Sequence, residues 1–319
     1  MSKGSKSRKK TTAAEEQGSL SGVKQLREIL GQEEAVTRLE RDLREKRFHH
    51  AYLFLGKRGI GKKALALSFA RSILCPVEPQ GFCGSCPVCR RLDQGSYSEF
   101  SGLFEEGGEK IRLEEVRDLL QGEHLMKYEG DYRIIFMENV ERLTEEAANS
   151  LLKVLEEPHE GTIFLLTASV PDRVLPTIQS RTEKYLLRPL SPAHLEQILR
   201  AMGFAAGEYA SLGTIDEALA LLEDKGQAPS YQEFRELMAG RDLGEIFALA
   251  ESLSKRAALR ELLSYYEVRA GEAYRTGREE LEIRIIRGLE VAQERIRSNV
   301  NKRNALEYSF LSIGGLISE

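Results

Sequence analysis

The stretch from Ala51 to Lys63 constrains the fold of this chain more than any other part of its sequence. Five mostly large apolar residues, Ala51 to Leu55, predict a buried strand that runs directly into a glycine-rich segment. A helix with apolar periodicity is expected from Leu65 to Leu74. This order is typical of a phosphate-binding loop (P-loop), in which backbone N–H groups and the helix N-terminus surround phosphate oxygens and a lysine reaches the terminal phosphates.

The candidate nucleotide-binding residues of the loop are Gly56, Gly59, Gly61, Lys62 and Lys63. The last of them departs from the motif G-x-x-x-x-G-K-[ST], because Lys63 stands where a hydroxyl should hold Mg²⁺. An ammonium group cannot ligate a cation and would repel one. We therefore expect ATP or ADP to bind weakly or not at all, and hydrolysis to be disfavoured. The alternative is a glycine-rich turn that holds no ligand.

A second buried strand is predicted at 132–137, and it ends at Glu138-Asn139. In P-loop ATPases such a strand ends in an acid that holds the metal, often followed by a glutamate that activates water. Glu138 suits the first role, whereas the amide of Asn139 lacks the basicity for the second. An ordinary strand end is the alternative. With a third strand predicted at 162–168 and helices between, the pattern favours a parallel, doubly wound α/β sheet.

All four cysteines of the chain lie in one short segment, 75–89, at Cys75, Cys83, Cys86 and Cys89. Their spacing, with glycine and proline between them, would bring four thiolates around one tetrahedral ion. Zinc in a structural role is the natural occupant. Disulfides, an iron–sulfur cluster and free thiols are the alternatives, of which a reducing compartment disfavours the first and the lack of a further Cys-Pro pair the second.

Length and charge limit the remaining possibilities. A chain of 319 residues predicts two or three compact units, and a net charge of −4 argues against bulk electrostatic binding to nucleic acid. Residues 1–20 carry five basic residues against two acids and predict a disordered basic tail. Because neither a signal peptide nor a membrane-spanning run is apparent, we expect a cytoplasmic protein without membrane contact.

Beyond residue 188 the strand-like runs end, and apolar residues recur at helical spacing. The stretch Gln227-Ala228-Pro229-Ser230 is the expected break within this helical region. We therefore predict an α/β domain at 21–187, a small helical domain at 188–228 and a larger helical domain at 229–319.

Five features together resemble one protein family. They are His50-Ala51-Tyr52-Leu53-Phe54, the P-loop, the four-cysteine segment, the run Asn149-Ser150-Leu151-Leu152-Lys153-Val154-Leu155-Glu156-Glu157-Pro158, and Thr177-Ile178-Gln179-Ser180-Arg181. In this combination the chain closely resembles bacterial clamp-loader subunits, AAA+ proteins of the DNA polymerase III holoenzyme, over residues 23–319. The resemblance implies an AAA+ domain with a zinc module, a small lid domain at 188–228, and a collar domain at 229–319 that oligomerises.

The departures from the family pattern indicate the class of subunit. The family's ATPase subunits carry Thr or Ser at Lys63, Asp-Glu at Glu138-Asn139, and a sensor arginine where this chain has Asp216. Arg181, which the family directs at a neighbour's nucleotide, is kept, although Thr182 replaces the usual cysteine. The loss of catalytic residues from the chain's own nucleotide site, together with the retention of the arginine that reaches a neighbour's nucleotide, is similar to the delta-prime class.

This resemblance implies a subunit with no ATPase activity alone. Its role would be to help load the sliding clamp onto primer-template DNA, within a heteropentamer that contains ATPase subunits of gamma/tau type and a delta subunit. Arg181 would be an arginine finger in trans. A catalytically active ATPase subunit of the loader is the alternative. A zinc-dependent DNA-binding protein is a third hypothesis, which the acidic balance and the lack of a recognition-helix motif disfavour.

Overall fold

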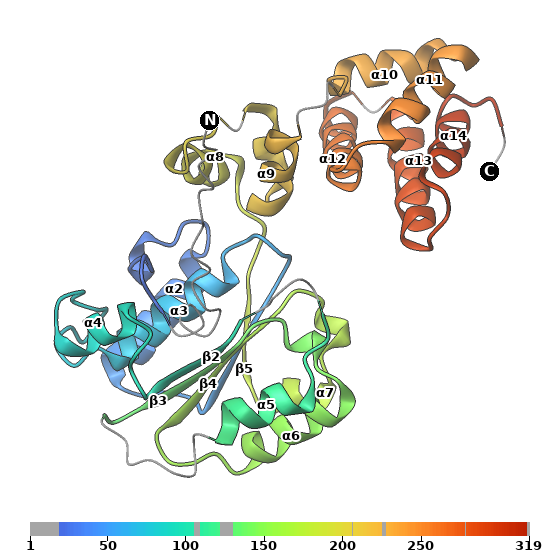
Figure 1. Cartoon of the computed structure of the whole chain (residues 1–319). Coiled ribbons are helices and arrows are strands. Elements are labelled where there is room, and N and C mark those ends of the chain that lie inside the picture. The colour runs from blue at the N-terminus through green and yellow to red at the C-terminus, as the bar shows by residue number, and fades with distance from the viewer. Residues whose placement is uncertain are drawn as a thin grey trace, which may run out of the picture. The chain divides into compact units, whose positions relative to one another are not determined.

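The computed structural model describes residues 19–104, 109–121, 130–205, 207–224, 228–277 and 279–317 (Figure 1). Nearly all of the predicted basic tail therefore lies outside the described residues, as does Gln227, the first residue of the predicted break at 227–230. The chain divides between Pro189 and Leu190 into two compact units.

The first unit contains one parallel five-stranded sheet. Its strands are β1 (Ala51–Leu55), β2 (Phe100–Leu103), β3 (Arg133–Met137), β4 (Thr162–Ala168) and β5 (Glu183–Leu186), in the order β2-β3-β4-β1-β5. The three central strands β1, β3 and β4 are buried along their whole length, as expected of parallel strands covered on both faces. These are the three strands that the sequence predicts. The short edge strands β2 and β5 are partly exposed and have no such apolar run.

Helices cover both faces of this sheet (Figure 1). On one face lie α2 (Glu33–Glu45) and α3 (Lys62–Leu74), and on the other α5 (Leu113–Gln121) and α6 (Glu145–Glu156). Strand β1 serves both cores, because Tyr52 and Phe54 pack with α2 and α3 whereas Leu53 and Leu55 point to the opposite face. Shorter elements are α4 (Pro87–Asp93), α7 (Pro176–Gln179) and 3₁₀ turns at Leu26–Glu28, Val140–Arg142 and Pro171–Arg173.

A buried carboxylate fixes α2 against the sheet. Oδ2 of Asp42 accepts hydrogen bonds from the hydroxyls of Tyr52 on β1, at 3.2 Å, and Tyr185 on β5, at 3.3 Å. The tyrosine hydroxyl of β1 also accepts a bond from the backbone N–H of His49. A buried acid needs such partners to offset its lost hydration, so this network ties one helix to two adjacent strands.

The second unit is helical throughout its described residues, as the sequence predicts. Its elements are α8 (Pro192–Ala201), the 3₁₀ helix η5 (Gly207–Leu212), α9 (Ile215–Glu223), α10 (Tyr231–Gly240), α11 (Leu243–Ser254), α12 (Leu259–Gly277), α13 (Glu280–Arg297) and α14 (Lys302–Ile313). One hydrophobic cluster extends from Leu190 to Ile313 through these helices. An ion pair of 3.3 Å between Asp224 and Arg256 also crosses the expected boundary at 228/229. The division into lid and collar stays a prediction.

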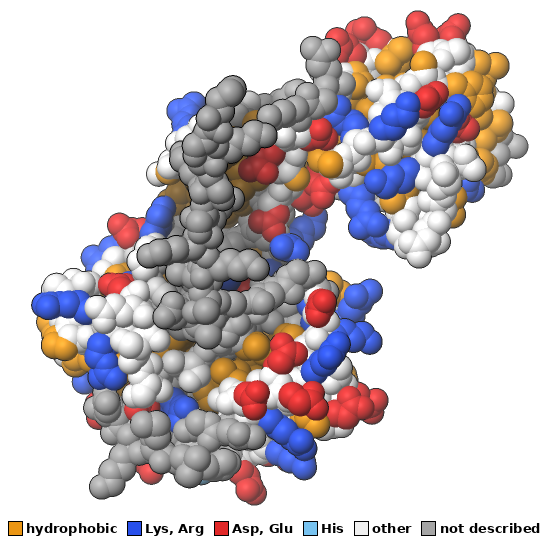
Figure 2. Space-filling view, in the orientation of Figure 1, with side chains coloured by type: hydrophobic (Ala, Val, Ile, Leu, Met, Phe, Trp, Pro, Cys, Tyr) orange, Lys and Arg blue, Asp and Glu red, His pale blue; other side chains and the backbone are white. Residues whose placement is uncertain are grey.

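Acidic and basic side chains are interspersed on the face of the molecule seen in Figure 2. They do not gather there into one extended basic field, which agrees with the slightly negative net charge. Among the described helices, none has the length and apolar character that crossing a bilayer requires.

Candidate functional site

The P-loop segment folds as the sequence predicts, between the carboxyl end of β1 and the first turn of α3. Gly61 lies at φ +98°, in the left-handed region, and forms the N-cap of α3. At Gly56 a Cβ atom would lie 2.7 Å from the carbonyl oxygen of Leu187, so a side chain does not fit without backbone movement. The two glycines therefore hold the loop in the compact form that a phosphate cradle requires.

Lys62 lies across this loop. Its side chain is buried, with 7% of the residue exposed, and Nζ donates hydrogen bonds of 2.7 Å to the carbonyl oxygens of Gly56 and Lys57. These carbonyls offset the cost of burying the ammonium. A phosphate oxygen at the loop would have to share the ammonium with them.

Lys63 and Glu138 form an ion pair at the mouth of the loop. Nζ of Lys63 lies 3.0 Å from Oε2 of Glu138 and 4.7 Å from the centre of the Phe104 ring. The residues at the two positions where a P-loop ATPase holds its metal thus contact each other, although 75 positions separate them. These side chains do not fit a magnesium ion, since one supplies a cation in place of an oxygen ligand and the other is neutralised by it.

Asn139 has a structural role. Its backbone N–H donates to Oγ1 of Thr167 at 3.1 Å, and its Oδ1 accepts from Oγ of Ser169 at 3.2 Å. The residue sits at φ +55°, a conformation that asparagine tolerates, and precedes a 3₁₀ turn. Asn139 therefore joins the ends of β3 and β4, and an amide held in this way is no base for water.

The four cysteines meet at one point. Cys75 follows α3 directly, Cys86 is the N-cap of α4, and Cys89 lies within that helix. The four Sγ atoms, including that of Cys83, all lie within 4.8 Å of one another. Tetrahedral coordination with Zn–S bonds of about 2.3 Å separates sulfurs by about 3.8 Å, and the Cys75–Cys83 sulfur separation is 3.8 Å. This group can hold one metal ion, and zinc would tie the segment into a rigid module.

Backbone N–H groups point at three of these sulfurs. The N–H of Cys83 donates to Sγ of Cys75, that of Cys86 to Sγ of Cys83, and that of Cys89 to Sγ of Cys86, at 3.3–3.4 Å. Backbone hydrogen bonds from Ser85 and Cys86 lower the pKa of the Cys83 thiol to about 6. Burial raises the pKa of the Cys89 thiol to about 12. The donors favour thiolates, whereas the buried Cys89 thiol would release its proton to solvent only when a bound cation takes the proton's place.

The cysteine module is attached to the rest of the unit through Arg71 and Gln25. The buried guanidinium of Arg71 pairs with Asp93 at 2.6 Å and lies 4.3 Å from the centre of the Phe82 ring. The side-chain amide of Gln25 donates to the carbonyl of Phe82 at 2.5 Å and accepts from its N–H at 3.3 Å. These contacts hold the module on α3 without using the sheet.

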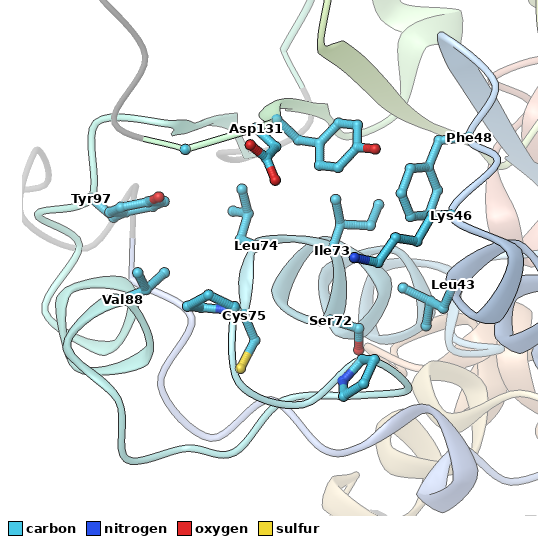
Figure 3. A pocket seen from close by; sticks show the side chains of 14 residues that line it. Leu43, Lys46, Phe48, Ser72, Ile73, Leu74, Cys75, Val88, Tyr97 and Asp131 are labelled. Carbon is cyan, nitrogen blue, oxygen red and sulfur yellow. The ribbon is translucent and has the colours of Figure 1, made fainter.

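A cavity of about 460 Å³ lies beside this module (Figure 3). It is bounded by the end of α3, the segment after α2 and the chain that enters β3, with Ile73, Leu74 and Phe48 as apolar walls and Lys46 and Asp131 as charged ones. No residue of the P-loop lines it. The cavity is therefore separate from the candidate nucleotide site.

Arg181 has an intramolecular partner. It follows α7, where its guanidinium donates to the carbonyl of Thr177 at 3.0 Å and to Oε1 of Glu156 at 2.7 Å. About a third of the Arg181 side chain is exposed. The structure thus brings together the two motifs at 149–158 and 177–181. Asp216, at the expected sensor position, is exposed in the first turn of α9 in the second unit.

A model of the family described as DNA polymerase III, delta subunit, matches residues 31–191. The match spans half of the chain and contains the P-loop, the four cysteines, Glu138 and Arg181. The chain belongs to this family. Together with the sheet order, the P-loop and the helical second unit, the match confirms the predicted α/β P-loop fold of AAA+ type.

Curated members of the DNA polymerase III proteins are similar to the same part of the chain. The chain is 38% identical over 175 residues to DNA polymerase III subunit delta' of Pseudomonas aeruginosa, covering 54% of this chain and 52% of that protein. It is 32% identical over 176 residues to DNA polymerase III subunit tau/gamma of Haemophilus influenzae, covering 54% and 25%. The chain thus spans about half or less of the length of these relatives. Relatives of both kinds match, so membership of the family does not choose between them.

Among solved structures, a DNA polymerase III gamma subunit-related protein of Thermotoga maritima aligns with a TM-score of 0.45 and 15% identity, covering 88% of this chain and 98% of that one. The RuvB Holliday junction branch migration motor of the same organism aligns with a TM-score of 0.44 and 17% identity, covering 89% and 90%.

Two residues at the site were missed by sequence reasoning. Phe104, which contacts Lys63, follows an edge strand that has no strong pattern. Glu156, the partner of Arg181, lies inside a motif that the sequence shows, yet nothing local indicates its partner.

Proposed function

We propose that this chain is a non-hydrolysing subunit of a DNA polymerase III clamp loader, of the delta-prime type, which helps to load the sliding clamp onto primed DNA. The observation that carries the proposal is the ion pair between Lys63 and Glu138. It removes both protein ligands that a P-loop ATPase uses to hold magnesium. The substitution of the sensor arginine by Asp216 and of the water-activating acid by Asn139 supports the same conclusion.

In this proposal Arg181 acts on ATP bound by an adjacent subunit. Its ion pair with Glu156 is partly exposed, with 34% and 51% of the two side chains accessible, and pairs of this kind contribute little free energy. A γ-phosphate carries more charge than a carboxylate and can draw the guanidinium away from it. An arginine finger contributes roughly 10³–10⁵ in rate.

The remaining parts of the proposal concern partners, metal and location. The helical second unit would assemble with gamma/tau-type ATPase subunits and a delta subunit, and through that complex the chain would meet the clamp and primer-template DNA. The cysteine module would hold one structural zinc ion. Four close thiols of this kind suit a reducing compartment, which supports a cytoplasmic location.

ATP turnover by the isolated chain tests the proposal against its main alternative. Similarity to tau/gamma proteins favours an active ATPase subunit as the second candidate. We expect negligible hydrolysis by the isolated chain, and stimulated hydrolysis only when ATPase subunits are added. Robust magnesium-dependent turnover that Lys62→Ala abolishes would establish the alternative instead.

A further inference from the structure

The ammonium of Lys63 is held in one place by contacts from two other segments. Glu138, which follows β3, accepts it at 3.0 Å, and the ring of Phe104, which follows β2, lies 4.7 Å away. Lys63 itself is in the first turn of α3. The carboxyl ends of three parallel strands thus place a positive charge beside the P-loop, at the carboxylate where a P-loop ATPase would hold its metal.

Magnesium has no place beside this ammonium. The ion needs near-octahedral oxygen ligands and loses its water reluctantly. The position that normally gives a hydroxyl gives a cation here, the carboxylate of Glu138 is already paired, and the Phe104 ring offers no oxygen. A magnesium ion would therefore have to displace one cation from Glu138 and remain close to it.

The loop keeps the features that favour a bare phosphate chain. Gly61 leaves the first N–H groups of α3 facing the loop, and Lys62 and Lys63 provide two ammonium groups at its edge. Phosphate oxygens free of magnesium carry their full negative charge, so two lysines can take over part of the role of the metal.

We propose that Lys63 and Glu138 together are a specificity determinant that excludes magnesium, so that the P-loop accepts a magnesium-free nucleoside di- or triphosphate and rejects the magnesium complex. This inference rests on the degenerate P-loop of the proposed function. It differs from that function in assigning the exclusion of metal to one ion pair and in naming the ligand form that the site accepts.

The test measures binding of N-methylanthraniloyl-ATP to the isolated full chain by fluorescence, in EDTA and in excess Mg²⁺. For the unmutated chain we expect binding in EDTA and a weaker affinity in excess Mg²⁺. Lys63→Thr restores the hydroxyl and frees Glu138, so magnesium should strengthen its binding by about tenfold or more. Adding Glu138→Gln to Lys63→Thr should remove this gain.

Lys184→Thr is the matched control, because it removes the same charge from an exposed position on β5, away from the loop. Its response to magnesium should equal that of the unmutated chain. Thermal unfolding of each variant, followed by circular dichroism, confirms that the chain remains folded. We expect all variants to remain folded, because 46% of the Lys63 side chain is accessible and an ion pair at such a position contributes little to stability.

Three outcomes would overturn the inference. The first is that magnesium does not weaken binding by the unmutated chain. The second is that folded Lys63→Thr shows no response to magnesium. The third is that the unmutated chain binds neither form, since the loop would then not accept a magnesium-free nucleotide. The experiment uses no partner subunit, so its failure leaves the proposed role in the loader standing.

Discussion

Replacing Arg181 by alanine separates a role in trans from a structural role. The structure shows that little folding energy is at stake. The replaced contacts are a partly exposed ion pair with Glu156 and hydrogen bonds to the backbone carbonyl of Thr177 and to Oγ of Ser180. Together they are worth about 1 kcal/mol or less in unfolding free energy. We therefore expect Arg181→Ala to fold, and to assemble with partner subunits as the unmutated chain does.

The catalytic effect should be much larger than the effect on stability. A finger acts on charge that develops in the transition state, and its loss can lower the rate at the neighbouring site by roughly 10³–10⁵. The assay is ATP hydrolysis by a reconstituted loader, stimulated by clamp and primed DNA, with assembly followed by size-exclusion chromatography. The steady-state loss equals the share of total hydrolysis that the site served by Arg181 supports.

Two further variants sharpen the interpretation. Arg181→Lys should restore the rate only in part, because lysine lacks the planar fork that engages phosphoryl oxygens at two points. Arg173→Ala removes an exposed arginine from the preceding 3₁₀ turn and should leave hydrolysis unchanged. A loader containing Arg181→Ala that hydrolyses ATP and loads clamps at the unmutated rate would refute the reasoning.

Three other predictions concern the metal, the core and the response to alkali. Purified, unchelated protein should carry about one zinc per chain by elemental analysis, and metal-free protein would contradict this. Cys89→Ala should release the zinc and make the cysteine module sensitive to proteases, while the circular dichroism spectrum of the chain stays unchanged. Asp42→Ala removes the acceptor of two buried tyrosine hydroxyls and should lower the unfolding free energy by about 1–3 kcal/mol in urea, whereas Glu45→Ala on the exposed side of the same helix should not. Burial raises the pKa of Tyr231 to about 12, so between about pH 10 and pH 12 the folded chain keeps a proton that the unfolded chain loses, and the unfolding free energy should fall over that range. Tyr231→Phe should make this fall shallower, and an unchanged slope would show that Tyr231 does not contribute to it.

The features of this protein that depend on local pattern could be predicted from the amino-acid sequence. The runs at 51–55, 132–137 and 162–168 are apolar along their length because central strands of a parallel sheet are buried on both faces. Helical periodicity likewise identified the region after residue 190, and the close spacing of four cysteines confined their thiols to a small volume.

The contacts between side chains that are distant in the sequence could not be predicted and became visible in the folded chain. Strand order and register bring the segment after β3 to the first turn of α3, so that Glu138 reaches Lys63 across 75 residues. The packing of α6 beside the turn after α7 gives Arg181 its partner Glu156. The edge strands β2 and β5 also depended on the fold, since four residues with mixed polarity become strands only when a neighbour supplies their hydrogen bonds. Local periodicity carries no information about such contacts, because an ion pair between elements depends on where the whole sheet places their ends.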